Sequence, residues 1–505
     1  MMMRVLIVCL CSLLSIGLSI GAIADASKAD NTTENPPTDA IDKQTNTSDF
    51  LPAPLPSIGE STSVGSKAEE KRLGQAWLKY FRRQAPLSSD PLIIEYTEGL
   101  LNQLSRYDPA AGNELSLVIV KDKTINAFAV PGGIIGVNTG LYAYAESEAQ
   151  FASVLAHELA HLSQRHYARG VKQQQGQSIL NTAALLGSIL IAAAGGGEAG
   201  IAALQATQAG IIDQQLRFSR SFEQEADRIG METLIKAGFN PHSMADMFEQ
   251  MQRATRFSAR PPEFLLTHPV TAKRIADAAN RARLYPSNTP RSSLDYDLMR
   301  ARVLLAGEPT PQQAISRFES ELRGFSASEV GTRYGLALAY TAAKEFNEAQ
   351  KLITELAEQH PNHPALIIAQ SDIDAGSGQL LKATNLIEQT LVKTPDNYSL
   401  NTQLSRLYAA NNDYKKAVDV LKNLALSRPN DTSVWFNLAE YAGLSGDILT
   451  LHKARTEFFL LRASFDSAEN QTNNIIKKFS YVPTEVAKAK QRLIDIQTLR
   501  ENSQL

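Results

Sequence analysis

A histidine pair and a glutamate stand close together in the stretch FASVLAHELAHLSQRHY, residues 151–167. His157 and His161 are four residues apart, so on a helix they project from one face, one turn apart, as two ligands of a single metal ion must. Glu158 follows the first histidine; in this motif it faces the water molecule that the metal activates and can take its proton. The pattern predicts a zinc peptidase site with Glu158 as general base. The alternative is two histidines on an ordinary helix surface.

A catalytic zinc ion needs a third protein ligand and an open fourth position. His166 is a poor candidate because the metzincin ligand spacing is not met, and we expect its side chain to face solvent at the helix end. Glu223 is a better candidate, since it begins a Glu-x-x-Ala-Asp pattern in the helical stretch FSRSFEQEADRIGMETL. Asp227 lies one turn later on the same face, where it could accept the free ring N–H of a ligating histidine.

The same acidic stretch allows two other interpretations. Glu225 could be the ligand instead, but it points roughly 160° around the helix from Asp227. The stretch could also be a solvated acidic turn without any ligand. Ala226 would let this helix approach the histidine helix closely, as a shared metal site requires.

A further histidine, His268, directly precedes Pro269 in PPEFLLTHPVTAKRI, which biases its backbone towards an extended conformation in a loop. Near an open zinc position it could stabilise the transition-state oxyanion. It could instead occupy the fourth coordination position and hold the enzyme latent. The structural alternative is a histidine that caps a helix starting near Val270. Arg274 is a candidate for pairing with a carboxylate near the site.

The elements that position these residues can be predicted in outline. Ser147-Glu-Ala-Gln150 matches a capping box, so we expect the histidine helix to begin at Ser147 and to end near Gly170, a suitable C-terminal cap. Upstream, residues 67–84 and 91–107 have helical patterns.

A β-rich passage lies between these helices. Residues 115–120, LSLVIV, are typical of a short buried strand, and residues 125–142, INAFAVPGGIIGVNTGLY, indicate a strand, a Pro-Gly-Gly turn and a second strand. Beside a metal site, such a hairpin would offer an edge strand to an extended peptide, held by main-chain hydrogen bonds that barely depend on sequence. The alternative is a purely structural hairpin.

After about residue 290 the sequence predicts helix after helix, with a period of 34 residues. Two residue types recur at this interval, proline at the closing turn and alanine at the helix crossing: Pro361, Pro395, Pro429, Ala349, Ala383 and Ala417. This is the tetratricopeptide signature. Three repeats span 330–430, and 292–325 and 432–463 look like degenerate or capping copies. Such arrays form a concave surface that binds peptides or proteins, although a helical spacer is the alternative.

The first 24 residues match an export signal. Arg4 supplies the positive charge, residues 5–20 are apolar, and Ala22-Ile-Ala24 is a cleavage site, with the cut expected after Ala24. The apolar run is long enough that an uncleaved membrane anchor is the alternative. Residues 25–60 are rich in Asn, Thr, Pro, Asp and Ser, which predicts a disordered tether.

The composition is that of a globular protein, with 505 residues, 43% apolar and 20% charged. A net charge of −3 offers no bulk attraction for nucleic acid, which we exclude as a partner. The apolar segment 178–210 contains too short an apolar core for a spanning helix. It could form a buried helical hairpin, a mobile lid or a peripheral membrane contact.

Four motifs, in this order, resemble one group of gluzincin peptidases: NAFAVPGG, HELAH, EQEAD and LLTHPVTAKRI. These are the soluble, exported relatives of the Ste24-type CAAX prenyl proteases, and the resemblance spans roughly residues 60–460. It implies one zinc ion held by His157, His161 and Glu223, with Glu158 as the catalytic carboxylate. The export signal and the repeats are similar to a periplasmic branch of this group. That similarity implies degradation of unfolded or misassembled outer-membrane proteins, help for correct ones, and repeats that dock on the β-barrel assembly machinery.

The predicted fold class is an α+β zincin-like metallopeptidase domain, mainly helical with a small β-sheet, followed by an all-α tetratricopeptide solenoid. The expected order is a signal peptide (1–24), a tether (25–60), the peptidase domain (61–290), the repeats (291–465) and a C-terminal helical tail (466–505). The competing hypothesis is a non-enzymatic chaperone or scaffold with a vestigial metal site, but a dead site has no need of Glu158. Prenyl-peptide processing is disfavoured because it needs an intramembrane chamber.

Overall fold

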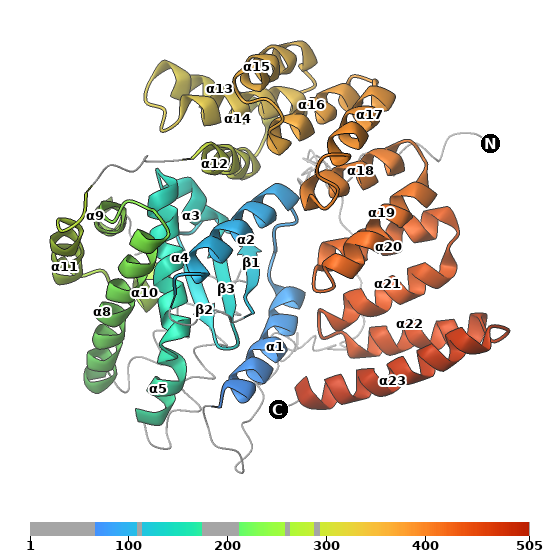
Figure 1. The fold of residues 1–505 in the computed structure, drawn as a ribbon, viewed down its shortest axis with the longest axis horizontal. Coiled ribbons are helices and arrows are strands. Elements are labelled where there is room, and N and C mark those ends of the chain that lie inside the picture. The colour runs from blue at the N-terminus through green and yellow to red at the C-terminus, as the bar shows by residue number, and fades with distance from the viewer. Residues whose placement is uncertain (1–65, 109–113, 174–211, 258–262, 287–292, 504–505) are drawn as a thin grey trace, which may run out of the picture. The chain divides into compact units, whose positions relative to one another are not determined.

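The computed structural model of the chain describes residues 66–108, 114–173, 212–257, 263–286 and 293–503 (Figure 1). The predictions for residues 1–60 and for the apolar segment 178–210 lie outside these residues. In the described part, helices surround one small sheet in the first half of the chain, and helices alone follow. The predicted fold class is therefore confirmed. None of the described helices is both long and apolar enough to cross a membrane.

Three short strands form the sheet: β1 (Ser116–Val120), β2 (Ala127–Val130) and β3 (Ile134–Asn138). Their order is β1-β3-β2, with β1 parallel and β2 antiparallel to the central strand. The predicted strand, turn and strand are confirmed, and β2 is an edge strand. Gly132 and Gly133 have φ angles of 89° and 88°. A Cβ on Gly133 would lie 2.2 Å from the Glu114 carbonyl oxygen, so the turn needs glycine there.

The helices of this first part are α1 (Lys67–Gln84), α2 (Pro91–Ser105), α3 (Thr139–Tyr144), α4 (Glu148–Ser163), α5 (His166–Gln173), α8 (Ile212–Lys236), α9 (His242–Phe257), α10 (Glu263–Thr267) and α11 (Ala272–Ala282). Both stretches predicted to be helical ahead of the sheet are helices. The chain leaves β3 directly into α3, where the sequence had predicted continued strand. Helix α4 packs against α8, α9 and the edge strand β2, so the histidine helix lies at the centre of this part (Figure 1).

Helix α4 begins where the sequence predicts. The Ser147 hydroxyl accepts a hydrogen bond from the Gln150 N–H at 3.2 Å. The Gln150 side chain in turn accepts one from the Glu146 N–H at 2.7 Å. Two N–H groups at the start of the helix are thus satisfied by neighbouring side chains, which fixes where the first turn begins.

The end of α4 differs from the prediction, which placed it near Gly170. The helix stops at Ser163, and α5 begins at His166. Between them Arg165 has a φ of 49°, in the left-handed region, and its guanidinium pairs with Glu70 of α1 at 3.1 Å. The left-handed turn and this tertiary contact redirect the chain, so Gly170 lies inside α5.

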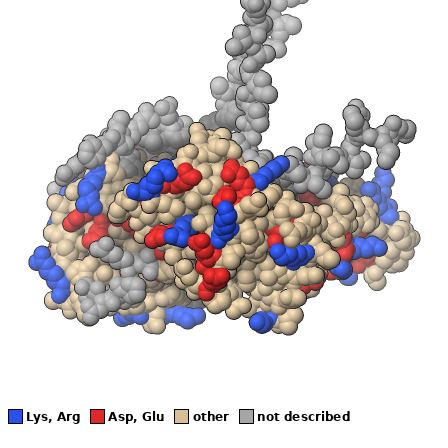
Figure 2. Space-filling view, turned by 90° about the horizontal axis from the view of Figure 1, so that it is seen from above, with Lys and Arg blue, Asp and Glu red and all other residues tan. Residues whose placement is uncertain are grey.

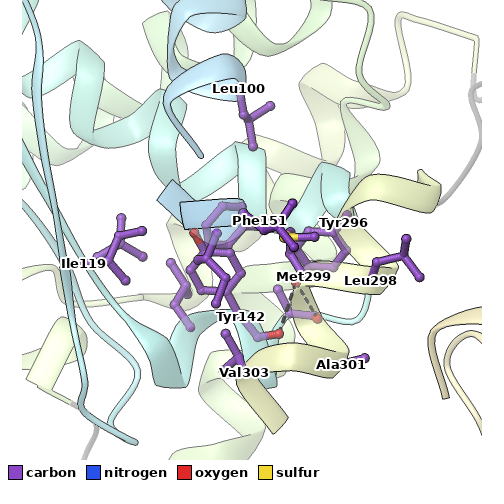
Figure 3. Packing of buried hydrophobic residues seen from close by; sticks show 14 of the residues in the cluster. Leu100, Ile119, Tyr142, Phe151, Tyr296, Leu298, Met299, Ala301 and Val303 are labelled. Atoms are coloured by element: carbon purple, nitrogen blue, oxygen red, sulfur yellow. Dashed lines mark hydrogen bonds between the residues drawn. The ribbon is translucent and has the colours of Figure 1, made fainter. Parts of the chain in front are cut away.

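Aromatic side chains from three helices form the centre of the core (Figure 3). The ring centroids of Tyr142 and Phe151 are 4.2 Å apart, and those of Phe151 and Tyr296 are 5.6 Å apart. The Tyr296 hydroxyl donates to the carbonyl oxygens of Ala145 at 2.9 Å and of Tyr142 at 3.2 Å. Tyr296 belongs to the first helix of the repeat region, so one core spans the sheet-containing part and the start of the repeats.

The repeat region consists of consecutive helices: α12 (Leu294–Gly307), α13 (Pro311–Arg323), α14 (Glu329–Ala342), α15 (Phe346–Gln359), α16 (Pro364–Gly376), α17 (Leu380–Leu391), α18 (Tyr398–Ala410), α19 (Tyr414–Ser427), α20 (Thr432–Ser445), α21 (Ile448–Leu460), α22 (Phe465–Lys478) and α23 (Pro483–Ser503). The period-34 alanines Ala349, Ala383 and Ala417 are all completely buried. Each lies in the second helix of a pair, where a small side chain lets the paired helices approach. The predicted repeats are confirmed.

Polar contacts join α2 to the repeat helices. Glu95 accepts hydrogen bonds from the N–H groups of Tyr398 and Ser399 at the start of α18, at 3.2 and 3.3 Å. Arg428, just after α19, donates to both oxygens of Glu98 at 2.7 and 2.8 Å. A carboxylate at a helix N-terminus satisfies donors that have no partner within the helix, so α2 caps α18.

Charges of both signs are interspersed on the face shown in Figure 2. Lys and Arg side chains lie beside Asp and Glu side chains along it, and no broad area of one sign is visible among the described residues on this face. Ion pairs such as Arg333–Glu329 at 2.8 Å are of this exposed kind, and each contributes little to stability.

Candidate metal centre

Three segments bring the predicted ligands together. Helix α4 carries His157 and His161, α8 carries Glu223, and His268 follows α10. Among the described residues these four form a group whose donor atoms all lie within 4.8 Å of one another. His157 and Glu223 are buried, whereas His161 and His268 are partly exposed. The group is therefore only partly enclosed by protein.

The spacing of the donor atoms fits a single ion. Two atoms that each lie about 2.0–2.1 Å from a tetrahedral ion are about 3.3 Å apart. His157 Nε2 is 3.1 Å from His161 Nε2 and 3.4 Å from Glu223 Oε2, and His161 Nε2 is 3.3 Å from Glu223 Oε1. His268 Nδ1 is 3.4 Å from His157 Nε2 and 3.0 Å from Glu223 Oε1. His268 Nδ1 thus lies at a distance from His157 and Glu223 that fits a fourth donor to the same ion.

The charges at this group also fit a divalent cation. Three carboxylates, Glu158, Glu223 and Asp227, lie around it, and among the described residues Arg274 supplies the one permanent positive charge in contact with them. With neutral histidines, two negative charges remain uncompensated. Within the described chain, the buried Glu158 Oε1 has no hydrogen-bond partner. Buried charges are normally paired or bound to a metal, so these side chains fit a metal ion.

The pKa shifts show how strongly the donors influence one another. Burial alone would lower the pKa of His157, but hydrogen bonding and charge from Asp227 and Glu223 raise it to about 9. Burial lowers the pKa of His161 to about 3. Burial also opposes ionisation of Glu223, yet His268 and the hydrogen bonds from the two α4 histidines hold its pKa well below the usual range. The two carboxylates thus favour positive charge on the neighbouring His157 ring.

Asp227 and Arg274 support the ligands from behind. Asp227 Oδ1 lies 3.0 Å from His157 Nδ1, the ring nitrogen that faces away from the other donors. Arg274 donates to both oxygens of Asp227 at 2.7 Å, and its Nη1 lies 2.9 Å from Glu223 Oε2. Burial would raise the pKa of Asp227, but Arg274 and His157 hold it below its usual value. Asp227 is therefore an ionised carboxylate beside the His157 ring.

Glu158 lies beside the four donors and is itself completely enclosed. Its side chain is 1% exposed, and its Oε1 lies 3.6 Å from His268 Nε2. Burial raises its pKa, an effect only partly opposed by His268 and His157. A carboxylate whose pKa moves upward towards neutrality is suited to exchange a proton with a reacting group.

The helix-capping interpretation of His268 is wrong. Helix α11 begins at Ala272, and its first turn is capped by the Thr271 hydroxyl, which accepts from the Arg274 N–H at 3.3 Å. The His268 N–H instead donates to the carbonyl oxygen of Phe264 at 2.7 Å. Its ring also stacks on Phe264, with centroids 4.7 Å apart. These contacts hold the ring over the metal group.

The predicted solvent position of His166 is also wrong, because it assumed an unbroken helix to Gly170. The His166 side chain is buried, with its Nδ1 2.9 Å from His161 Nδ1. Glu225 lies outside the metal group and accepts from His166 and Arg169 at 3.2 and 2.9 Å. Glu225, the alternative ligand considered from the sequence, thus belongs to a separate cluster with His166 and Arg169.

Sequence reasoning missed one residue that positions the ligands. Ala226 is completely buried against α4, as the close approach of the two helices requires. One turn further along α8, a Cβ on Gly230 would lie 3.1 Å from the backbone of Ala156 and His157. The signal was present as a second small residue four positions after Ala226. Together the two residues set the distance between the ligand-bearing helices.

Comparisons with known proteins agree with this geometry. Residues 96–282 match the model of Peptidase family M48, and residues 375–440 match a tetratricopeptide repeat model. A relative in Vibrio cholerae is 36% identical over 422 residues, which are 83% of this chain and 87% of the relative. The beta-barrel assembly-enhancing protease of Escherichia coli (strain K12) is 31% identical over 455 residues, or 90% of this chain and 92% of that one.

The chain belongs to the beta-barrel assembly-enhancing protease family. The protein of that name in Yersinia pestis is 31% identical over 459 residues, 90% of this chain and 94% of the relative. The chain combines an M48 peptidase domain with helical repeats. It is a metalloprotease, and the four-residue group is its candidate metal site.

Proposed function

We propose that this protein is a zinc-dependent endopeptidase of the periplasm. In this role it degrades misassembled outer-membrane β-barrel proteins and assists the assembly of correct ones. The observation that carries the proposal is the group of His157, His161, Glu223 and His268, whose donor atoms lie within 4.8 Å of one another, beside the enclosed Glu158. Three of these donors are the residue types that hold a catalytic zinc ion, one ion per chain.

When bound, zinc supplies Lewis-acid chemistry: it polarises the scissile carbonyl and makes a water molecule acidic. Glu158 takes the proton of the attacking water and passes it to the leaving amine, for which its burial and raised pKa are suited. Asp227, locked by Arg274, keeps His157 Nδ1 protonated so that Nε2 points towards the ion. The edge strand β2 would hold an extended substrate by main-chain hydrogen bonds.

His268 favours a second, non-proteolytic state of the same molecule. Its Nδ1 lies 3.4 Å from His157 Nε2 and 3.0 Å from Glu223 Oε1, which supports binding at the open position of a catalytic zinc. In that position it is a latch, and the protein would act as a chaperone-like scaffold until a client displaces the ring. One molecule would thus act as a scaffold while His268 is bound and as a protease once it is displaced.

The names of the relatives and the sequence support the proposed clients and location. The relatives' name refers to β-barrel assembly, and residues 1–24 have the pattern of a cleaved export signal. The repeats would present a surface for a protein partner, for which the β-barrel assembly machinery is the candidate.

The test is a paired measurement on residues 25–505. Zinc content is determined by elemental analysis, and casein cleavage is compared between the wild type and Glu158→Gln. We expect one zinc ion per chain in both proteins, and cleavage lowered by at least about 100-fold in the variant, because proton transfer is lost. Equal cleavage by both proteins would contradict the role of Glu158, and absence of zinc would contradict the metal site.

A further inference from the structure

The two ligand histidines on α4 are supported from behind in different ways. His157 Nδ1 faces the carboxylate of Asp227. His161 Nδ1 instead faces a second imidazole, His166 Nδ1, at 2.9 Å. His166 is 6% exposed, so this contact is shielded from water. The position of this buried nitrogen raises the question of what His166 does for the His161 ring.

His166 is not itself a ligand in this arrangement. It contacts the ring nitrogen of His161 that lies opposite Nε2, the atom close to His157 and Glu223. Among the described residues, the group able to hold one ion contains four members and does not include His166. Its influence on the ion must therefore pass through the His161 ring.

We infer that His166 and Glu225 form a relay that orients the metal ligand His161, and that His166 is a positioning residue for the metal site. This inference rests on the proposed zinc site. With His161 Nε2 facing the ion, its Nδ1 carries the proton and donates to His166 Nδ1. The His166 proton is then on Nε2, which donates to Glu225 Oε2 at 3.2 Å. One assignment of protons therefore gives each ring nitrogen of His161 and His166 a partner.

The surroundings hold the relay in place. The His166 ring stacks on the Phe222 ring, with centroids 4.5 Å apart and an angle of 15° between the ring planes. Arg169 donates to Glu225 at 2.9 Å, and its guanidinium carbon lies over the Phe222 ring, 4.9 Å from the centroid. The left-handed turn at Arg165 brings α5 back against α8, so that a residue five positions after His161 can reach its ring.

The expected consequence is a zinc affinity that depends on His166. Removing the group behind a metal-ligating histidine typically weakens metal binding by about 10- to 100-fold. His166→Phe keeps a ring for stacking on Phe222 but removes the acceptor. His166→Asn keeps a side-chain oxygen close to the position of Nδ1 and should restore most of the affinity.

The experiment measures zinc dissociation constants of the full mature chain by competition with a chromophoric chelator. The matched control is His452→Phe, the same change at a histidine that is equally buried, at 6%, far along the chain in α21. We expect a loss of about 10- to 100-fold for His166→Phe, a loss within about threefold for His166→Asn, and none for the control. Circular dichroism of the zinc-free proteins checks that all are folded.

A double variant separates a relay from a general packing effect. Glu225→Leu, at a side chain 27% exposed, should weaken zinc binding in the same direction, by less than His166→Phe. If Glu225 acts only through His166, the double variant binds zinc no more weakly than His166→Phe alone. If His166→Phe folds poorly, the same double-variant comparison can be made with His166→Asn combined with Glu225→Leu.

The outcomes separate this inference from the proposed function. A wild type that binds zinc, with His166→Phe binding equally well, would overturn the relay and leave the zinc site standing. Additive losses in the double variant would also overturn it. A wild type that binds no zinc would overturn the proposed metal site and the relay with it.

Discussion

At the residue scale, side-chain type and helical spacing carry most of the information about the site. The i,i+4 spacing of His157 and His161, and of Glu223 and Asp227, places each pair on one face of a helix, and the structure brings all four together. His166 could not be placed in this way. Its position depends on the turn at Arg165, which is stabilised by a contact with a distant helix.

His268 allows a prediction at this scale. Because its Nδ1 lies close enough to the other donors to bind the same ion, His268→Ala should open a position for water and raise casein cleavage by the zinc-loaded protein several-fold. Steady-state cleavage and zinc content, measured together against the wild type, test it. Loss of turnover with zinc retained would favour the oxyanion role, and unchanged turnover would contradict both.

At the element scale, the sequence predicts where helices begin better than where they end. The Ser147 cap is a local interaction between neighbouring residues, so the start of α4 could be predicted from the motif. Its end is decided by tertiary contacts. The distance between α4 and α8 depends on small residues, of which Ala226 was identified in advance and Gly230 was not.

Gly230 provides the prediction for this scale. A Cβ there would meet the α4 backbone at 3.1 Å, so Gly230→Val should push the ligand-bearing helices apart. We expect a loss of about 1–3 kcal/mol in the free energy of unfolding, together with weaker zinc binding. Gly99→Val in α2, where nothing lies within 4 Å of a Cβ, is the matched control. Similar losses in both variants would show that helix propensity, not close approach, is responsible.

At the scale of the whole molecule, the peptidase part and the repeats share a core and a set of polar contacts. The 34-residue period predicted the repeats because it recurs within the sequence. Nothing in that period indicates which repeat contacts α2. The Tyr296 hydrogen bonds and the capping of α18 by Glu95 join residues about 150 and 300 positions apart, so only the folded chain reveals them.

These contacts predict how the repeats are held. Replacing both Glu95 and Glu98 by alanine removes the cap of α18 and the partner of Arg428. Hydrogen exchange at the start of α18 should become about 10-fold or more faster, since hydrogen bonds to charged groups contribute about 1.5–3 kcal/mol each. Glu329→Ala, which removes an exposed pair with Arg333, is the control and should change little. Unchanged exchange in α18 would contradict the capping role.

The central claim is that His157, His161, Glu223 and His268 surround one zinc ion. X-ray absorption at the zinc edge tests it most directly, on the wild type and on His268→Ala. We predict four nitrogen or oxygen donors at about 2.0–2.1 Å in the wild type, three of them imidazoles, and the loss of one imidazole in the variant. The same number of imidazoles in both proteins would contradict the claim.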